Sequence, residues 1–194
     1  MAADRTSPDR ELEKQTVARA AVSLVREGQV IGLGSGSTAA YFIRLLGERV
    51  KAGLKVRGVA TSLQSEQLAR QCGIPLTTLD EVPAVDIDFD GADECDPQLQ
   101  LIKGGGGALL REKVVASVAK KFVVLADSSK QVAVLGGCPL PVEVVPFAHA
   151  AVSRKITDLG GSATLRRKAG GAFTTDNGNY ILDCRFGQIA DPAA

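Results

Sequence analysis

The residues best suited to chemistry form two neighbouring clusters near the middle of the chain. Asp90 and Asp93 frame a Gly-Ala pair, and Lys103 precedes a run of four glycines that ends at Gly107. Glycine loses the most backbone freedom on folding, so such a run is expected where a backbone passes very close to a ligand. Its successive N–H groups would form a concave anion site. A flexible linker is the alternative, but linkers rarely lie between apolar segments without Ser or Pro.

The segment after the glycines adds a candidate base. Residues 108–116 favour a helix, which would place the loop at a positive helix N-terminus. Glu112 falls in about the second turn of that helix. Because His149 is the only histidine, acid–base chemistry is expected from carboxylates, Lys or Tyr rather than from a His-based triad. We interpret His149 as a structural helix residue.

A second glycine-rich turn lies nearer the N-terminus. Residues 34–39 formally match the loose dinucleotide-binding pattern, but the strand about twenty residues later ends Val59-Ala60-Thr61, without an acidic residue for a ribose hydroxyl. The hydroxyls of this turn suit a compact phosphate instead. No Walker lysine accompanies it, which argues against nucleotide hydrolysis. A purely structural tight turn stays open.

The aspartate pair and a later lysine allow several interpretations. Asp90 and Asp93 could hold sugar hydroxyls, share a proton, chelate a metal or cap the next segment. A metal is disfavoured because no His or Cys accompanies them and Lys103 supplies positive charge. Lys130, after Asp127-Ser128-Ser129, is either a ligand contact or an ordinary surface charge.

Composition limits the classes of protein. The chain has 194 residues, 45% apolar and 23% charged, which is ordinary for a globular protein of one or two domains. The net charge of +1 and the absence of a long basic run argue against a nucleic-acid partner. The Arg166-Arg167-Lys168 triplet is interpreted as a solvated edge.

Two further features indicate the compartment. No apolar run reaches membrane-spanning length, and the N-terminus is polar rather than a signal peptide, so no membrane association is expected. The four cysteines show no Cys-x-x-Cys spacing, which favours a reducing cytoplasm over zinc binding or a disulfide framework.

Residues 1–132 are expected to form a Rossmann-like α/β domain, with a mainly parallel sheet and helices on both faces, because strand and helix patterns alternate. Helices are predicted at 9–27, 38–50, 62–72 (opened by a Thr61/Gln64 capping box) and 108–116. Strands are predicted at 30–33, 55–60, 75–77, 85–89 and 122–126. The candidate loops all follow strands, and ligands bind at the carboxyl ends of such sheets. One shared site is therefore expected.

Residues 133–194 are expected to form a smaller, ferredoxin-like α+β domain. The predicted elements are a strand at 139–146, a helix at 148–159, and strands at 162–167 and 179–186 after a turn at 176–178. The chain finishes Asp191-Pro192-Ala193-Ala194, which is typical of a helix start. The sequence is therefore expected to stop short of its natural end.

Taken together and in order, these blocks resemble ribose-5-phosphate isomerase of the A type. The resemblance rests on 34–38, Thr61-Ser62 with Ser65-Glu66, 90–94, 101–113, 126–130 and 176–183. It implies interconversion of D-ribose 5-phosphate and D-ribulose 5-phosphate in the non-oxidative pentose phosphate pathway, without metal or organic cofactor. It also implies a cytoplasmic homodimer or dimer of dimers, and a family pattern that continues past residue 194 with a helix and further strands.

The resemblance implies roles for individual residues. Glu112 would be the general base that moves a proton between carbons 2 and 1 through an enediolate, and Lys14 would be a further phosphate contact. The implied substrate contacts are Ser35, Gly36, Ser37, Thr38, Asp90, Gly91, Ala92, Asp93, Lys103, Gly104, Gly105, Gly106 and Lys130.

Three other functions stay open. A coenzyme A transferase of similar fold would use a glutamate as nucleophile. An amino-sugar phosphate deaminase would be expected to show a His-centred site, whereas His149 lies outside every motif. A non-catalytic sugar-phosphate sensor would bind without turnover, usually beside a DNA-binding module, for which the chain has no room.

Overall fold

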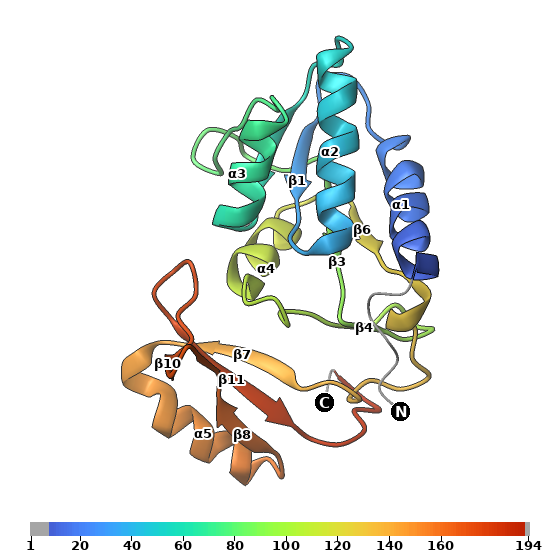
Figure 1. Cartoon of the computed structure of the whole chain (residues 1–194). Coiled ribbons are helices and arrows are strands. Elements are labelled where there is room, and N and C mark those ends of the chain that lie inside the picture. Colours follow the sequence, from blue (N-terminus) through green and yellow to red (C-terminus); the bar gives the residue numbers. More distant parts are fainter. Residues whose placement is uncertain (1–7, 193–194) are drawn as a thin grey trace. The chain divides into compact units, whose positions relative to one another are not determined.

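The computed structural model describes residues 8–192, which divide into two compact units (Figure 1). The first unit runs to Gly91 and includes Leu110–Ser129; the second comprises Ala92–Leu109 and the chain from Lys130 onward. The single division expected at residue 132 therefore differs from the compact units. The reason is that residues 92–109 are tied to the later part of the chain: Glu94 accepts backbone hydrogen bonds from Gly136 and Cys138. The expected division into domains at residues 1–132 and 133–194 stays a prediction.

The first unit contains a four-stranded sheet in the order β2-β1-β3-β6, with every pair parallel. Its strands are β1 (Val30–Leu33), β2 (Arg57–Ala60), β3 (Ile87–Gly91) and β6 (Phe122–Leu125). The chain leaves β1 towards β2 on one side and returns as β3 on the other, so the topological switch point lies between β1 and β3. This arrangement confirms the expected α/β fold with a parallel sheet.

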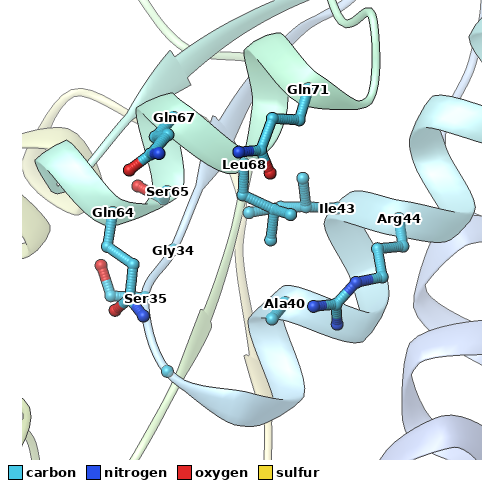
Figure 2. A pocket seen from close by; sticks show the side chains of 11 residues that line it. Gly34, Ser35, Ala40, Ile43, Arg44, Gln64, Ser65, Gln67, Leu68 and Gln71 are labelled. Carbon is cyan, nitrogen blue, oxygen red and sulfur yellow. The ribbon is translucent and has the colours of Figure 1, made fainter.

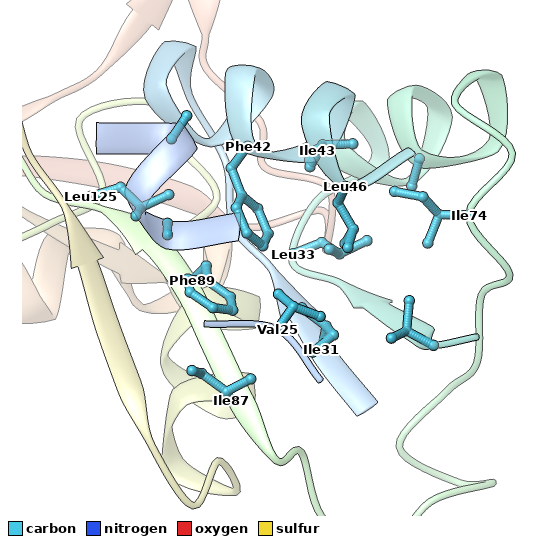
Figure 3. Packing of buried hydrophobic residues seen from close by; sticks show 14 residues of the cluster. Val25, Ile31, Leu33, Phe42, Ile43, Leu46, Ile74, Ile87, Phe89 and Leu125 are labelled. Carbon is cyan, nitrogen blue, oxygen red and sulfur yellow. The ribbon is translucent and has the colours of Figure 1, made fainter. Parts of the chain in front are cut away.

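Helices cover both faces of this sheet. They are α1 (Pro8–Val22), α2 (Ser37–Lys51), α3 (Leu63–Gln71) and α4 (Leu109–Ser117). On one face α1, α2 and α3 pack with Ile31 and Leu33 of β1, and Phe42 of α2 stacks on Phe89 of β3 with ring centroids 4.3 Å apart (Figure 3). On the other face Val115 of α4 packs with Val30 and Val59. The two-residue alternation along β1 thus supplies side chains to both cores.

The second unit is built on a three-stranded antiparallel sheet in the order β7-β11-β8. Its elements are β4 (Glu94–Cys95), β5 (Leu101–Ile102), η1 (Ser128–Lys130, which begins in the first unit), β7 (Leu140–Val144), η2 (Pro146–Ala148), α5 (His149–Asp158), β8 (Ser162–Leu165), β9 (Arg167–Lys168), β10 (Gly171–Ala172) and β11 (Tyr180–Arg185). Ile156 of α5 packs on Leu182 and Cys184 of β11 and on Val144 of β7. One helix on an antiparallel sheet gives the expected α+β character.

Several boundaries differ from the sequence-based expectations. Helix α1 ends at Val22 rather than near residue 27. Beyond that point the hydrogen bonds join residues three apart, such as the Val25 N–H to the Val22 carbonyl, and form a tighter turn than an α-helix. Residues 75–77 form only an isolated bridge, Gly58 to Leu76, not a strand. Strand β3 runs on to Gly91, so Asp90 is a strand residue rather than part of a turn. The helix start expected at 191–194 lies partly outside the described residues.

Candidate active site

The loop after β1 in the first unit requires glycine at two positions. Gly36, the N-cap of α2, has φ +93°, which is the left-handed region that glycine tolerates. At Gly34 a Cβ would lie 2.2 Å from Asp90 Oδ1 and 2.5 Å from Asp90 Cα. The ends of β1 and β3 therefore approach too closely for any side chain. This packing delivers Ser37 and Thr38 to the first turn of α2, where backbone N–H groups lack intrahelical partners.

Asp90 braces this loop from β3. Its Oδ1 accepts the N–H of Ser35 at 2.9 Å and the N–H of Gly91 at 2.7 Å, and the residue is 0% exposed. Hydrogen bonds to a carboxylate are stronger than neutral ones. The resemblance implies that Asp90 contacts the substrate, and this role stays a prediction. The structure shows that its carboxylate also holds the backbone of the loop.

A cluster of hydroxyl groups lies behind the same loop. Ser35 Oγ donates to Ser62 Oγ at 2.7 Å and lies 3.1 Å from Thr61 Oγ1. Ser62 is the N-cap of α3 and forms a capping box with Ser65. The capping box expected from Thr61 and Gln64 is therefore wrong by one position. It fails because Thr61 turns its hydroxyl to the Leu33 carbonyl.

Glu112 lies in the first turn of α4, not the second, because the helix begins at Leu109 rather than at residue 108. The residue is 6% exposed, so its carboxylate is largely shielded from bulk water. It shares the inward side of α4 with Val115, three residues on, which packs in the core. A shielded carboxylate is suited to moving a proton within a site that excludes water.

The glycine run of the second unit is a tight turn. Gly104 and Gly107 have φ values of +97° and +92°, and the N–H of Gly107 donates to the Gly104 carbonyl at 3.0 Å. The N–H of Gly105 donates to Asp93 Oδ2 at 2.7 Å. Two N–H groups of the expected anion site, those of Gly105 and Gly107, therefore donate within the protein. Fewer N–H groups of this turn are left to bind a ligand.

Added side chains distinguish one glycine of this run from the others. A Cβ at Gly104 would lie 2.7 Å from the Leu109 Cβ, one at Gly105 2.6 Å from Asp93 Oδ1, and one at Gly107 2.6 Å from Phe173 Cζ. At Gly106 a Cβ would meet no atom within 4 Å, and its φ lies outside the left-handed region. Packing explains the other three glycines, whereas Gly106 presents an open backbone.

Arg166 is a residue that sequence reasoning misplaced. Rather than lying at a solvated edge, its side chain is 16% exposed and pairs with the Asp183 carboxylate. Its Nη1 also donates to the carbonyls of Gly105, at 3.0 Å, and Gly104, at 3.3 Å. Arg166 thus holds the glycine turn through its carbonyl groups. No local pattern reveals this, since the partners lie about sixty residues apart.

Glu94 is a second residue that the sequence did not single out for this purpose. It is buried, and its carboxylate accepts the N–H groups of Gly136 and Cys138 at 2.7 and 2.5 Å. Burial and the negative charge of Glu94 raise the pKa of the Cys138 thiol to about 12. Glu94 therefore ties residues 136–138 to the segment that follows β3.

The three lysines of interest have different settings. Lys103 is half-buried after β5, and Lys130 is half-buried at the end of η1, which is shaped by Asp127 accepting the N–H of Ser129 at 2.9 Å. Lys14 in α1 is buried and donates to Glu11 at 2.6 Å. That bond, and one from the Tyr41 hydroxyl, hold the pKa of Glu11 below its ordinary value.

The predicted site residues are divided between the units. The first unit holds Ser35, Gly36, Ser37, Thr38, Asp90, Gly91 and Glu112. The second holds Ala92, Asp93, Lys103, Gly104, Gly105, Gly106 and Lys130. The structure brings Ser35 together with Asp90 in the first unit, and Asp93 together with Gly105 in the second. The chain passes between the units at 91–92, between the two aspartates, and again at 109–110 and 129–130.

A cavity of about 250 Å³ lies in the first unit between α2 and α3, with the residues of the β1 loop at one end (Figure 2). Its lining combines apolar and polar side chains. The lining residues are Gly34, Ser35, Gly36, Ala40, Ile43, Arg44, Gln64, Ser65, Gln67, Leu68 and Gln71. Ser65 therefore faces both this cavity and the hydroxyl cluster.

Residues 8–192 lack two features that would indicate other functions. Within that range, no group of three or more His, Cys, Asp or Glu side chains is arranged to hold a metal ion. None of the helices there has the length and apolar character that crossing a membrane requires.

The class of protein is therefore a two-unit α/β protein. Its first unit is doubly wound with loops at the switch point, and its smaller α+β unit carries a glycine turn held by Asp93 and Arg166. A family profile described as ribose 5-phosphate isomerase A (phosphoriboisomerase A) matches residues 57–194. Ribose-5-phosphate isomerase A of Parvibaculum lavamentivorans is 51% identical over 187 residues, covering 93% of this chain and 81% of the relative. The chain belongs to the ribose 5-phosphate isomerase A family.

Solved structures agree with this assignment. Ribose 5-phosphate isomerase A from Methanocaldococcus jannaschii superposes with a TM-score of 0.90 at 50% identity, covering 94% of this chain and 82% of the other. A D-ribose-5-phosphate isomerase in complex with phospho-erythronic acid gives a TM-score of 0.91 at 44% identity, with the same coverages. The family resemblance expected from the sequence is confirmed.

Proposed function

We propose that this protein interconverts D-ribose 5-phosphate and D-ribulose 5-phosphate, an aldose–ketose isomerisation of the non-oxidative pentose phosphate pathway. Membership of the ribose 5-phosphate isomerase A family supports the reaction. The observation that carries the chemistry is Glu112, a buried carboxylate in the first turn of the helix that follows the glycine turn.

The reaction requires two proton movements. The proton on carbon 2 of the aldose is removed, an enediolate forms, and a proton is added to carbon 1; the hydroxyl proton of O2 is lost while O1 gains one. We propose that the Glu112 carboxylate performs both carbon transfers. One group can do both because the enediolate presents the two carbons side by side. Phospho-erythronic acid, the ligand in the related structure, has a planar carboxylate comparable to the two oxygens of an enediolate.

Other predicted residues would stabilise and orient the substrate. We propose that Lys103 and the amide of Gly106 stabilise the developing oxyanion, since the N–H groups of Gly105 and Gly107 are engaged in the turn. The first turn of α2, at Ser37 and Thr38, would hold the phosphate. Asp90, Asp93 and Lys130 would contact the sugar. The phosphate, remote from carbons 1 and 2, would align the reacting end.

A coupled assay for ribulose 5-phosphate tests the proposal. Glu112→Gln should lower kcat by about 10²–10⁴ and leave KM within about threefold, because it removes a general base but little volume. The matched control is Glu66→Gln, the same change in the first turn of α3, where Glu66 pairs with Arg70 at the surface. Unchanged kcat in Glu112→Gln would remove Glu112 from the mechanism. A wild-type protein without turnover would overturn the function itself.

We propose further that the reaction needs no metal or organic cofactor, as the family resemblance implies. Activity should survive exhaustive dialysis against EDTA followed by assay in metal-free buffer. A loss that added divalent cation restores would contradict this.

We also propose a homodimer or dimer of dimers that acts in the cytoplasm. Phe147 in η2 is 99% exposed, and Val145 beside it is also exposed, which is the kind of apolar surface that a partner covers. Light scattering should give a mass about two or four times that of the 20.2 kDa chain. A monomer at micromolar concentration would contradict the proposed assembly.

A further inference from the structure

We infer that Ser35 is a positioning residue whose backbone N–H and side-chain O–H both donate to acceptors inside the protein. The buried hydroxyl of Ser62 is the acceptor that orients the Ser35 side chain. The inference rests on the proposed function, because it concerns how the loop after β1 is prepared for the substrate phosphate. All of the residues involved lie in the first unit.

The protons of Ser35 are both assigned to protein acceptors. Its N–H donates to Asp90 Oδ1 at 2.9 Å, and its hydroxyl donates to Ser62 Oγ at 2.7 Å. A hydroxyl carries one proton, so a donor committed to Ser62 cannot also serve a phosphate oxygen. Phosphate oxygens accept hydrogen bonds, so they gain nothing from the lone pairs that Ser35 has left.

The direction of the Ser35–Ser62 bond follows from the groups behind it. Ser62 Oγ donates to Ser65 Oγ at 3.1 Å, and Ser65 Oγ donates to the Ser62 carbonyl at 3.0 Å. A carbonyl only accepts, which sets the end of the chain of donors. Reversing the Ser35–Ser62 bond would take the Ser62 proton away from Ser65 and remove one hydrogen bond from a buried network.

Burial makes this network costly to disturb. Thr61, Ser62 and Ser65 are all buried, and the backbone N–H groups of Ser62 and Ser65 are bonded to each other's hydroxyls. Thr61 Oγ1, bonded to the Leu33 carbonyl, also lies 3.1 Å from Ser35 Oγ. The N-terminus of α3 is thus a fixed support for the loop that begins α2. Phosphate contact then falls to residues 36–38.

The test is a double-mutant cycle on KM for ribose 5-phosphate. Ser35→Ala and Ser62→Ala should each raise KM about fivefold, the factor that corresponds to one neutral hydrogen bond. The double variant should be no worse than either single one, because both remove the same bond. We expect every variant to have a kcat within about twofold of the wild-type value. Ser62→Thr should have the wild-type KM because it keeps the hydroxyl.

Two other outcomes would overturn the inference. If Ser35 binds phosphate directly, Ser35→Ala alone raises KM tenfold or more, and Ser62→Ala leaves KM unchanged or lowers it by releasing the Ser35 proton. If Ser62 only caps α3, Ser62→Ala lowers the melting temperature without changing KM. KM does not depend on the folded fraction, so partial unfolding does not obscure the result. Ser23→Ala, which removes an exposed hydroxyl at the end of α1, is the control.

The inference and the proposed function fail separately. Should the wild-type protein not isomerise ribose 5-phosphate, the function falls. The wild type, the two single alanine variants and the double variant are then titrated with inorganic phosphate by calorimetry. If both single variants bind phosphate equally weakly and the double variant binds it no more weakly, the role of Ser62 is supported. Weakening in Ser35→Ala alone contradicts it.

Discussion

The loop at residues 34–38 in the first unit and the loop at residues 103–107 in the second each carry a strand into a helix through glycines. Each also gives one backbone N–H to an aspartate: Ser35 to Asp90, and Gly105 to Asp93. In the first loop the aspartate is fully buried and its own backbone presses on Gly34. In the second, Asp93 is half-buried, and Arg166 holds the carbonyls from the other side.

The difference shows two ways of ordering a glycine loop. The first loop is ordered by a backbone packed against a neighbouring strand, which leaves no freedom to adjust. In the second loop Gly104 and Gly107 are also closely packed, but Gly104 and Gly105 are held in addition by two charged side chains, which can turn. Both aspartates and Glu94, which binds the N–H groups of Gly136 and Cys138, come from residues 90–94. A five-residue acidic segment therefore organises backbone in both units.

The largest expected effect comes from filling the space at the first loop. Gly34→Ala should destabilise the protein by about 4 kcal/mol, because the new Cβ would meet the Asp90 backbone, whereas Gly105→Ala should cost about 1 kcal/mol because Asp93 can rotate away. Urea unfolding of both variants measures the difference. Equal losses would show that the two loops are packed alike.

Removing the aspartates should give the next largest difference. Asp90→Ala deprives two part-buried N–H groups of a charged acceptor and should cost about 3 kcal/mol; Asp93→Ala deprives one exposed N–H, which water can satisfy, and should cost about 1 kcal/mol. Chemical denaturation at pH 7 gives both values. A greater loss for Asp93→Ala would reverse the comparison.

Arg166 tests the second loop alone. Arg166→Ala should cost about 2 kcal/mol, since it leaves the Asp183 carboxylate and two carbonyls without their donor. The exposed neighbour Arg167 is the matched control, and Arg167→Ala should change the free energy of unfolding by less than about 0.5 kcal/mol. Indistinguishable variants would mean that Arg166 does not hold the turn.

The smallest effect concerns the thiol beside Glu94. Burial first and then the Glu94 charge raise the pKa of Cys138 to about 12, so its thiolate is scarce at pH 8 and its alkylation by iodoacetamide should be slow. The rate should rise about tenfold for each pH unit below that pKa, as deprotonation proceeds. Glu94→Gln should lower the pKa and speed alkylation, as read by peptide mass spectrometry. Fast alkylation of the wild-type thiol at pH 8 would contradict this setting.

The sequence by itself determined the parallel sheet, the helices on both faces, the second α+β unit and the family. Those features follow from local patterns: alternating apolar strands, helix-forming runs and glycine turns in a fixed order. It also selected Glu112 and the two glycine loops, because unusual residue types at strand ends are visible along the chain. The roles of these residues stay predictions until the variants are measured.

Only the tertiary structure decided which groups hold the loops. Arg166 and Gly104 are about sixty residues apart, and Ser35 and Ser62 come from different strand–helix turns, so no local pattern joins them. It also decided that Asp90 lies within β3, facing the backbone of the β1 loop, and that residues 92–109 belong to the second unit. Backbone N–H groups become costly when buried, and their acceptors are assigned only once distant segments pack together.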